Sequence, residues 1–512
     1  EIAGSDWSSD VCSSDLYTGE PGFLSEADIG GYILEKKKIW KDERVQAGVL
    51  VLAAFLLLTA WAFMQPLGAG PDEKMRYMVA QYLHEHPGKL PLGDEPTIRD
   101  ATWGISYAYY PILSYMVSAV FMGIAGLFHA SADGLLHAAR MADVLFVTGA
   151  VYFVVKASGK LFPKEGRWLF AALAGFMPQA LFLGTYVNTD SLALLSMAMI
   201  LYSWSCYLEA RDWSFRNSIL LAVGMAVCAL SYYNAYGWIL CSFLFFCLTV
   251  LLCREEPVKQ RVAFLLRRGI VIAAVTLALC GWWFIRNAVL YDGDLIGRKA
   301  CAQCAEKYAA VDYRPSRYPT PEKLNWSWKD ILLYQDPGWQ HNWLLTVLVS
   351  FIGTFGLMQI YMPYSVSKAY FLFFGMGGIG ILTMLGIFYP KKRTVVKERK
   401  AAGSEKLKIK TITVYDKWDR KGIFHLLLIL LILIPVGLFM YYVYYSDNQA
   451  QGRYIMPALY PAMYFVTAGW NRLLERFVKK ENIRMWIYRV LTALLAASPF
   501  LCYIFLVVPF YG

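Results

Sequence analysis

Long apolar runs dominate the chain and are separated by short polar segments. Uncharged runs such as 49–64, 426–445 and 491–508 approach or reach the roughly 20 residues that a helix needs to cross a bilayer. The pattern predicts eleven spans, at 47–65, 138–156, 168–187, 191–208, 218–234, 236–253, 269–286, 366–389, 423–445, 455–473 and 486–508. We therefore expect an all-α polytopic membrane protein with about eleven transmembrane helices.

The distribution of lysine and arginine predicts the orientation of these spans, because basic residues gather in short cytoplasmic loops. A basic cluster at 36–44 precedes the first span and places the preceding chain in the cytoplasm. Alternation then assigns to the cytoplasm the loops 156–167, 209–217, 254–268, 390–421 and 472–489, which together with that cluster hold 34 of the 49 Lys and Arg residues. The two large outer loops, 66–137 and 287–342, hold only four and seven.

Two further apolar stretches, 105–128 and 343–362, complicate this count. Counting the first as a span would move 156–167 and 254–268 to the outside, and counting only the second would move the basic loop 390–421 there. We interpret both as interfacial or re-entrant helices on the outer face, since a helix can lie in the plane of the interface. The alternative, that one or both span the membrane, stays open at this point.

The composition excludes a soluble enzyme. Hydrophobic residues make up 57% of the 512 and charged residues 17%, whereas an ordinary globular domain is about 25% charged. A net charge of +11 would suggest nucleic acid as the partner of a soluble domain, but here the basic residues lie in loops, so we expect membrane lipids and no nucleic acid. The loop 390–421, with twelve basic and four acidic residues, is interpreted as a solvated connection with a secondary attraction to anionic lipid.

The beginning of the chain does not read as part of a fold. Residues 1–16, EIAGSDWSSDVCSSDL, show no periodicity and no apolar core of a signal peptide, and they resemble translated sequencing adapter. We treat them, with Cys12, as a non-native artefact, which leaves the natural start of the chain open. Residues 17–46 are then a cytoplasmic N-terminal segment, and 47–510 form a single transmembrane domain.

The first outer loop holds the strongest candidates for chemistry. Directly after the first span come Asp72 and Glu73, followed further on by Asp94, Glu95 and Asp100. Adjacent carboxylates at a membrane surface can supply a general base and a second group that orients a substrate or holds a cation. The competing interpretation is that Asp72 caps a helix while Glu73 interacts with the helix dipole.

Three later candidates lie at outer ends of predicted spans: Asp190, Arg286 and Arg453, the last followed by Tyr454. An arginine at this depth either forms a site or anchors the helix at the interface. Because guanidinium groups bind phosphate through two hydrogen bonds, arginines and carboxylates on one face suit an anionic lipid. We predict that Asp72, Asp190, Arg286 and Arg453 surround one cavity, covered by the two outer loops and walled by 105–128.

At these residues the chain resembles the C-type superfamily of integral-membrane glycosyltransferases, specifically glycosyltransferase family 39 and related bacterial proteins. The similar strings are Pro71-Asp72-Glu73, Tyr77-x-x-Ala80, Asn188-Thr189-Asp190-Ser191-Leu192-Ala193, Trp283-x-x-Arg286-Asn287 and Gly452-Arg453-Tyr454-x-x-Pro457. The resemblance covers about residues 45–510 and implies transfer of a sugar, with inversion, from a polyprenyl-phosphate donor to a glycan, lipid or protein acceptor. It implies an active site on the outer face of the bacterial plasma membrane.

In that mechanism Asp72 and Glu73 are catalytic, while Asp190, Arg286, Arg453, Tyr454 and Asp100 bind substrate. The second carboxylate of the family is not clearly placed, because Asp94, Glu95 and Asp100 compete for it. His84, His86 and His341 give no convincing metal site, so participation of a divalent cation stays open. A lipid-linked sugar transporter or flippase without catalysis is the alternative function, and a structural or assembly subunit is the third.

Two motifs have simpler interpretations. The string Gly375-Met376-Gly377-Gly378-Ile379-Gly380 lies within an apolar run with no preceding strand, which favours close packing of helices over nucleotide binding. Cys301 and Cys304 lie in the second outer loop, where a disulfide and free thiols are both compatible with the sequence. A zinc site would need two further ligands.

Overall fold

A computed structural model describes residues 42–383, 392–400, 407–415 and 419–512. The proposed artefact 1–16, its Cys12, most of the segment 17–46 and part of the loop 390–421 lie outside the described residues. The chain divides into two compact units, 1–50 and 51–512. The described part of the first unit contains the first turns of helix α2, and all the other elements lie in the second.

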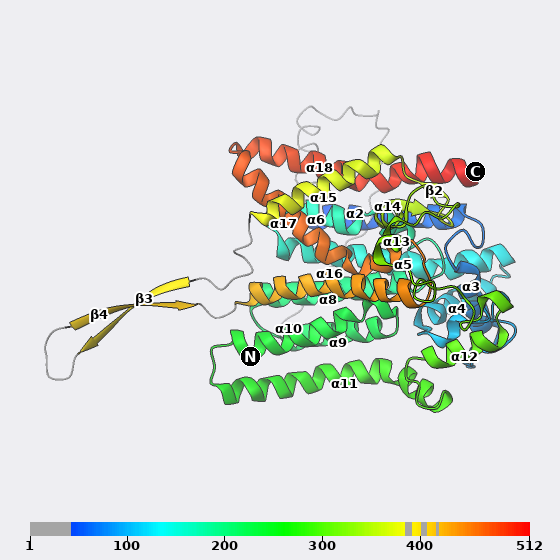
Figure 1. The fold of residues 1–512 in the computed structure, drawn as a ribbon. Coiled ribbons are helices and arrows are strands. Elements are labelled where there is room, and N and C mark those ends of the chain that lie inside the picture. Colours follow the sequence, from blue (N-terminus) through cyan, green and yellow to red (C-terminus); the bar gives the residue numbers. More distant parts are fainter. Residues whose placement is uncertain (1–41, 384–391, 401–406, 416–418) are drawn as a thin grey trace, which may run out of the picture. The chain divides into compact units, whose positions relative to one another are not determined.

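Helices form most of the described chain (Figure 1). The elements up to the second outer loop are α2 (Glu43–Met64), α3 (Glu73–Glu85), η1 (Tyr107–Tyr109), α4 (Leu113–Gly126), α5 (Ala132–Leu161), α6 (Gly166–Gly175), α7 (Pro178–Phe182), α8 (Asp190–Ala210), α9 (Phe215–Ala229), η2 (Tyr233–Ala235), α10 (Gly237–Cys253) and α11 (Val258–Leu290).

The remaining elements are α12 (Arg298–Tyr308), η3 (Val311–Tyr313), α13 (Trp328–Leu333), α14 (Trp343–Gly353), β1 (Thr354–Phe355), β2 (Ile360–Tyr361), α15 (Tyr364–Leu382), β3 (Lys392–Lys400), β4 (Leu407–Tyr415), α16 (Arg420–Tyr445), η5 (Gly452–Ala458), α17 (Leu459–Phe477), α18 (Glu481–Cys502), η6 (Tyr503–Val507) and α19 (Val508–Tyr511).

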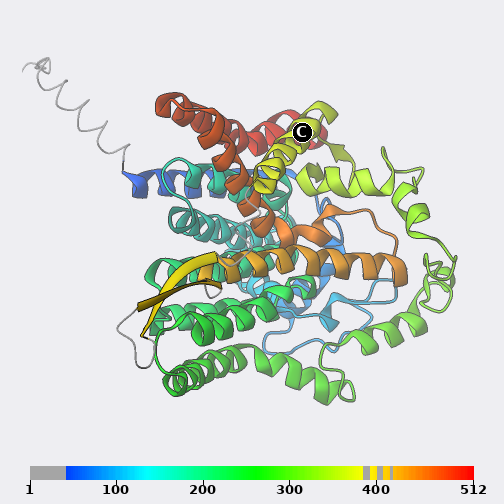
Figure 2. The ribbon, with the colours of Figure 1, turned by 60° about the vertical axis from the view of Figure 1, so that its left-hand side comes forward.

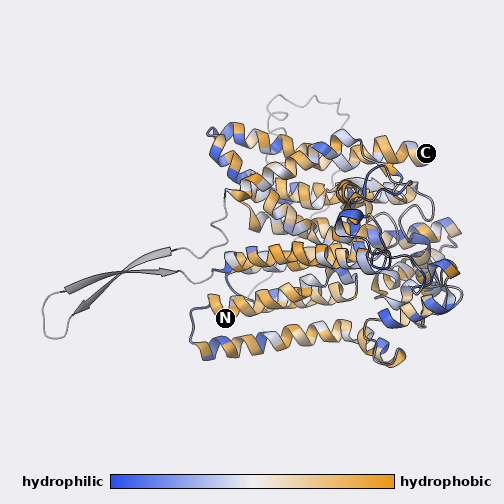
Figure 3. Ribbon diagram, in the orientation of Figure 1, coloured by the Kyte–Doolittle hydropathy of each residue, from blue (hydrophilic) through white to orange (hydrophobic). Residues whose placement is uncertain are grey.

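Eight helical stretches of the described chain are long and apolar enough to cross a bilayer. Seven contain α2, α5, α8, α10, α11, α15 and α16, and the eighth, Glu481–Tyr511, joins α18 to α19. Figure 3 shows apolar residues along these helices and polar residues concentrated toward their ends. The prediction of an all-α polytopic membrane protein is thereby confirmed, and eight of the eleven predicted spans fall on these stretches.

Of the other three predicted spans, 168–187 and 218–234 fall on shorter helices, and 455–473 falls on η5 and the 19-residue α17, which is not apolar enough to be among the eight. In the predicted span 168–187, Pro178 requires an extended residue before it, and Met177 accordingly separates α6 from α7. In the span 455–473, the chain enters as the 3₁₀ turn η5, which contains Pro457, before α17 begins. The span 218–234 ends early, because α9 stops at Ala229.

The two ambiguous apolar stretches form short helices. Residues 105–128 contain η1 and the 14-residue α4, and residues 343–362 contain the 11-residue α14 and the β1–β2 ladder. A 14-residue helix is only about 21 Å long, less than the roughly 30 Å hydrocarbon core. Neither helix is long enough to cross a bilayer by itself.

The segments predicted to lie outside gather at one end of the helical bundle. Figures 1 and 2 show α3, α4, α12 and α13 at that end, while the β3–β4 hairpin extends from the other. The hairpin pairs Lys392 with Tyr415 through Lys400 with Leu407. The loop 390–421 was predicted as a plain connection and instead contains this antiparallel ladder.

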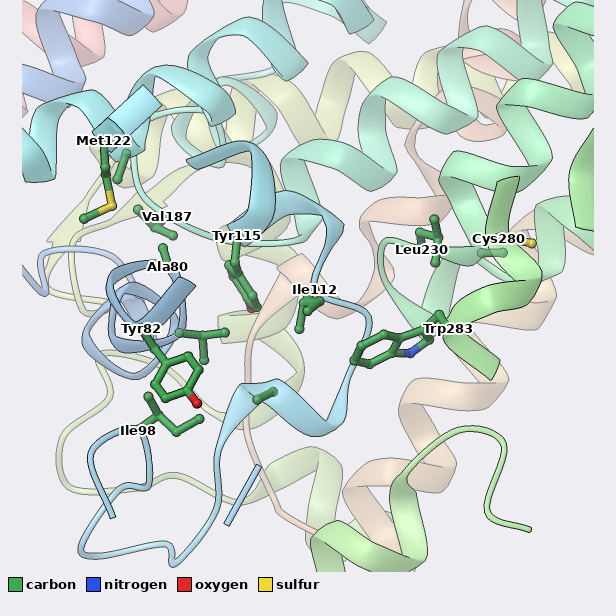
Figure 4. Packing of buried hydrophobic residues seen from close by; sticks show 14 of the residues in the cluster. Ala80, Tyr82, Ile98, Ile112, Tyr115, Met122, Val187, Leu230, Cys280 and Trp283 are labelled. Atoms are coloured by element: carbon green, nitrogen blue, oxygen red, sulfur yellow. The ribbon is translucent and has the colours of Figure 1, made fainter. Parts of the chain in front are cut away.

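A buried apolar cluster holds the first outer loop against the ends of the spans. Figure 4 shows Tyr82 of α3, Tyr115 and Met122 of α4, and Trp283 of α11 in this cluster. Burying one large apolar side chain away from water contributes about 1.5–3 kcal/mol to stability. The loop is therefore a packed layer, which can hold its polar residues in fixed positions.

The glycine motif of α15 has the packing role that its apolar context predicts. A Cβ on Gly377 would lie 2.8 Å from the carbonyl oxygen of Val466, and one on Gly380 would lie 2.2 Å from that of Gly469. A Cβ on Gly469 in α17 would lie 1.8 Å from the carbonyl oxygen of Gly377. The two helices therefore approach backbone to backbone, which side chains larger than hydrogen would prevent.

Candidate functional site

A strained turn before α3 places the first candidate, Asp72. A Cβ on Gly70 would lie 2.2 Å from the ring of Tyr186, so the chain passes too close for any side chain. Asp72 itself has φ 61°, in the left-handed region that few residues other than glycine adopt. Its carboxylate makes no capping hydrogen bond to α3. The helix-cap interpretation of Asp72 is therefore wrong, and the carboxylate is available for other contacts.

Asp72 lies in a network of two carboxylates and two arginines. Its Oδ2 is 2.6 Å from Nη2 of Arg453 and 3.6 Å from Nη2 of Arg76. Nη1 of Arg76 also donates to Oδ2 of Asp190 at 3.2 Å. The structure thus brings together three of the four residues predicted to converge, Asp72, Asp190 and Arg453, and links them through Arg76.

The arginines control the charge of Asp72. Burial by itself would raise the pKa of this carboxyl, but the guanidinium groups of Arg453 and Arg76 outweigh that effect and lower the pKa to about 2. The hydroxyl of Tyr107 lowers it further. Asp72 is consequently ionised at neutral pH, and 30% of its side chain stays exposed although the arginines are almost fully buried.

A cavity of about 280 Å³ is lined by the two arginines of this network, and Asp72 and Asp190 lie behind them, outside the lining residues. Its walls combine arginine, tyrosine and a few apolar side chains, with Arg76, Tyr107, Tyr110, Thr189, Tyr232, Tyr233, Asn234, Arg298, Leu438, Tyr441, Tyr442, Arg453 and Tyr454 among them. The Nε atoms of Arg76 and Arg453 are buried and have no hydrogen-bond partner among the described residues. Orphaned guanidinium N–H groups beside a cavity indicate room for an anion.

Glu73, the second predicted catalytic acid, occupies a different environment. Its carboxylate accepts from Nε and Nη2 of Arg140 at 2.7 and 2.8 Å, and from the backbone N–H of Gly68 at 2.8 Å. Arg140 also donates to the carbonyl oxygens of Ala62, Gln65 and Pro66. Both side chains are fully buried. Glu73 therefore has no free lone pair facing the cavity and instead ties the Asp72 turn to α5.

Two predicted substrate-binding residues lie away from this network. Arg286 donates to the carbonyl oxygen of Pro91 and to Oδ1 of Asn287, and its guanidinium lies over the ring of Trp283. The predicted convergence was wrong for this residue, because equal depth in the membrane does not set lateral position. The carboxylate of Asp100 accepts from the backbone N–H groups of Thr102 and Trp103, which makes it part of a local turn.

The other first-loop acids also lie outside the cavity lining, whereas Tyr454 belongs to it. Glu95 accepts from the backbone N–H groups of Leu92 and Gly93, and Asp94 lines a separate cavity of about 360 Å³. Tyr454 follows Arg453, donates to Oε1 of Gln449 and places its ring 5.2 Å from the Arg453 guanidinium. Tyr454 thus lies at the cavity wall next to Arg453.

Sequence reasoning missed Arg76, Arg140 and Asp143 as contributors. Asp143 is fully buried and accepts from Ser191 Oγ and the backbone N–H of Asn188, so it fixes the turn before Asp190. Arg140 and Asp143 fall inside the predicted span 138–156, and charged residues inside a span are a usable signal. Arg76 lies four residues after Asp72, one helical turn away, which is the spacing of an ion pair.

The carboxylates of this network bind arginines. Among the described residues, no three His, Cys, Asp or Glu side chains lie close enough to hold a metal ion. Asp72 and Asp190 both bind guanidinium groups already, and cationic surroundings would repel a metal ion. Cys301 and Cys304 are both buried free thiols rather than a disulfide.

Comparison with known proteins gives a distant likeness. No protein-family model and no curated protein sequence matches the chain. Solved structures that resemble this chain include forms of the oligosaccharyltransferase of Archaeoglobus fulgidus. The apo form is 13% identical with a TM-score of 0.48, and covers 88% of this chain and 55% of that chain. The form described as AglB in complex with an inhibitory peptide and a dolichol-phosphate is 14% identical with a TM-score of 0.45, and covers 89% and 55%.

A third structure of that enzyme, tethered to an acceptor peptide through a disulfide bond, is 13% identical with a TM-score of 0.46. It covers 89% of this chain and 54% of that chain. This chain therefore spans about half the length of the structures that it matches.

Proposed function

We propose that this protein is a membrane glycosyltransferase that transfers a sugar from a polyprenyl-phosphate donor to an acceptor, with inversion. The observation that carries the proposal is the partly exposed carboxylate of Asp72, held 2.6 Å from Arg453 beside a cavity with orphaned guanidinium N–H groups. This pairing of a base with an anion-binding wall is what transfer from a phosphate leaving group requires. The motif resemblance points the same way.

The cavity suits an amphipathic phosphate. Arg76 and Arg453 present N–H groups that can bind phosphate oxygens through charge-assisted hydrogen bonds. On another wall, Leu438 and Tyr441 of α16 line the cavity and are also 42% and 56% exposed. A phosphate bound at the arginines could therefore extend its prenyl chain along α16 and into the surrounding lipid.

In the proposed reaction Asp72 is the general base. The acceptor hydroxyl attacks the anomeric carbon, its proton passes to the Asp72 carboxylate, and a new glycosidic C–O bond forms. The bond between the anomeric carbon and the phosphate oxygen breaks, and its electron pair leaves with the polyprenyl phosphate. Arg76 and Arg453 stabilise the negative charge that grows on this phosphate.

Sharing of the arginines would couple donor binding to the strength of the base. While the guanidinium groups of Arg453 and Arg76 face only Asp72, the pKa of this carboxyl stays near 2 and it accepts a proton poorly. A bound phosphate would neutralise part of their positive charge, and the pKa of Asp72 would rise toward its ordinary value. The base then becomes effective only when the donor is present.

We place this site on the outer face of a bacterial plasma membrane, as the charge distribution and the resemblance imply. A glycan, a lipid or a protein could serve as acceptor. In this proposal Glu73 is a positioning residue, because its carboxylate contacts only Arg140 and backbone N–H groups. Asp190 positions Arg76 in the same sense.

The proposal is tested by Asp72→Asn in proteoliposomes, supplied with a panel of undecaprenyl-phosphate sugars and membrane-derived acceptors. We expect transfer to fall about 10²- to 10⁴-fold, the usual loss when a general base is removed. Asp100→Asn is the matched control, because Asp100 lies in the same loop and its turn tolerates asparagine.

Full transfer activity of the Asp72→Asn protein would refute the assignment of the base. Translocation of the lipid-linked sugar by wild-type protein without any turnover would favour the transporter instead. Thermal unfolding of both variants in detergent shows whether a loss of transfer reflects chemistry or folding.

A further inference from the structure

A third arginine reaches the cavity beside Asp72 from the second outer loop. Arg298 is the first residue of α12, lines the cavity and is exposed. Arg76 and Arg453 each pair with carboxylates. Arg298 forms no ion pair with any residue that the structure describes. It is therefore a cation whose charge is not already used.

The backbone around Arg298 is packed against the cavity walls. Gly297 has φ 71°, and a Cβ there would lie 2.5 Å from the carbonyl oxygen of Tyr109, so α12 begins in close contact with η1. The hydroxyl of Tyr233 in η2 donates to the carbonyl oxygen of Ile296. These two contacts join the start of α12 to the elements that carry Tyr107, Tyr110 and Asn234 into the cavity.

The guanidinium, rather than the helix end, is what α12 offers a ligand. Oδ2 of Asp294 accepts from the backbone N–H groups of Lys299 and Ala300 at 2.7 and 3.0 Å. The first turn of the helix is thus capped by a carboxylate, which would repel an anion from the backbone. The side chain of Arg298 leaves this cap and lines the cavity.

We propose that Arg298 is a third anion-binding residue, which holds the donor phosphate from the α12 wall while Arg76 and Arg453 hold it from the other. The pairing supports this role, because Asp72 and Asp190 bind the two buried arginines, whereas Asp294 binds backbone N–H groups and leaves the guanidinium of Arg298 without an ion pair among the described residues. The identity of the ligand as a sugar donor rests on the proposed function, whereas phosphate binding does not.

The test is equilibrium binding of farnesyl phosphate to the purified full-length protein in detergent. We expect Arg298→Ala to weaken binding on the order of 10- to 100-fold, the effect of losing a charge-assisted hydrogen bond. The affinity of Arg298→Lys for farnesyl phosphate should lie between those of wild type and Arg298→Ala, because lysine keeps the positive charge but lacks the planar guanidinium group. Lys299→Ala is the matched control: Lys299 is adjacent and equally exposed, does not line the cavity, and should leave affinity unchanged.

Two further probes separate the phosphate from the prenyl chain. Inorganic phosphate should lose the same factor in Arg298→Ala, and farnesol should bind wild type and variant equally. Equal affinity of Arg298→Ala and wild type for farnesyl phosphate would overturn the inference, and so would an equal loss for farnesol. Farnesyl phosphate binding that depends on Arg298 in a protein without transfer activity would refute the proposed function and leave this inference intact.

Discussion

Asp72 and Glu73 are neighbours in the chain, and each carboxylate binds an arginine from a distant segment. Glu73 and Arg140 are both fully buried, and their polar atoms are filled by each other and by backbone groups. Asp72 is 30% exposed, shares two arginines whose Nε atoms have no described partner, and lies beside a cavity. The hydrogen-bonding groups of Glu73 and its arginine are thus fully paired, whereas those of Asp72 and its arginines are not, although the two acids are adjacent in the chain.

This difference indicates that Glu73 forms a structural ion pair, whereas Asp72 belongs to a reactive site. A buried ion pair with every hydrogen bond satisfied has nothing left for a ligand, and its contribution is to hold the turn in place. A carboxylate with a strongly lowered pKa, partial exposure and incompletely satisfied partners is the combination found at functional sites. The structural ion pair also supports the reactive site, because Glu73 and Arg140 fix the loop that holds Asp72 in its left-handed conformation.

The largest effect on stability is expected from Glu73→Gln. The amide cannot neutralise the buried guanidinium of Arg140, so we expect the free energy of unfolding to fall by about 3–5 kcal/mol. The measurement is thermal unfolding in detergent, followed by size-exclusion chromatography. Asp72→Asn serves as comparison and should lose less stability, because Arg453 and Arg76 line a cavity where water can solvate their charge, whereas Arg140 is fully buried. A Glu73→Gln protein with wild-type stability and no transfer would instead make Glu73 a catalytic residue, as the motif resemblance implies.

The sequence predicts much of this arrangement, because the length of an apolar run reflects the thickness of the bilayer and the distribution of basic loops reflects the orientation of the spans. Eight spans, the packing role of the glycine motif, and the meeting of Asp72 with Asp190 and Arg453 follow from pattern and parity. The interrupted spans at Pro178 and Pro457 were within reach of the same reasoning, since both prolines are visible in the sequence.

The different fates of Asp72 and Glu73 could not be predicted. Two adjacent carboxylates are chemically alike in the sequence. Only the tertiary fold pairs Glu73 with Arg140 and Asp72 with Arg453. The misplacement of Arg286 has a related cause, because parity fixes depth along the membrane normal while helix packing fixes lateral distance. Pairing partners across the fold are the information that one sequence lacks.

Arg453→Ala tests how far the arginine controls the pKa of Asp72. Without this guanidinium, burial raises the pKa of Asp72 above about 2, and Arg76, at 3.6 Å, and the hydroxyl of Tyr107 still oppose the rise. The acid limb of kcat/KM, which reports groups of the free enzyme, should therefore move to higher pH. We also expect kcat/KM near neutral pH to fall roughly 10- to 100-fold through loss of charge-assisted hydrogen bonds to phosphate.

The control for this shift is Arg453→Lys, which keeps the positive charge and should keep the acid limb near its original pH. Coinciding acid limbs for wild type and Arg453→Ala would show that Asp72 does not titrate in the rate-limiting step. The comparison between a reactive and a structural carboxylate would then lose its functional half.

The smallest expected effect is that of Arg286→Ala. Its guanidinium contacts the carbonyl oxygen of Pro91, the amide of Asn287 and the ring of Trp283, and none of these residues lines the cavity beside Asp72. Because removing contacts distant from the reacting groups changes energies by about 0.5 kcal/mol, the KM for the donor should change by less than about threefold. Steady-state transfer kinetics across donor concentrations provide the measurement. A loss as large as that of Arg453→Ala would restore Arg286 to the phosphate site and show that the cavity closes around it when the donor binds.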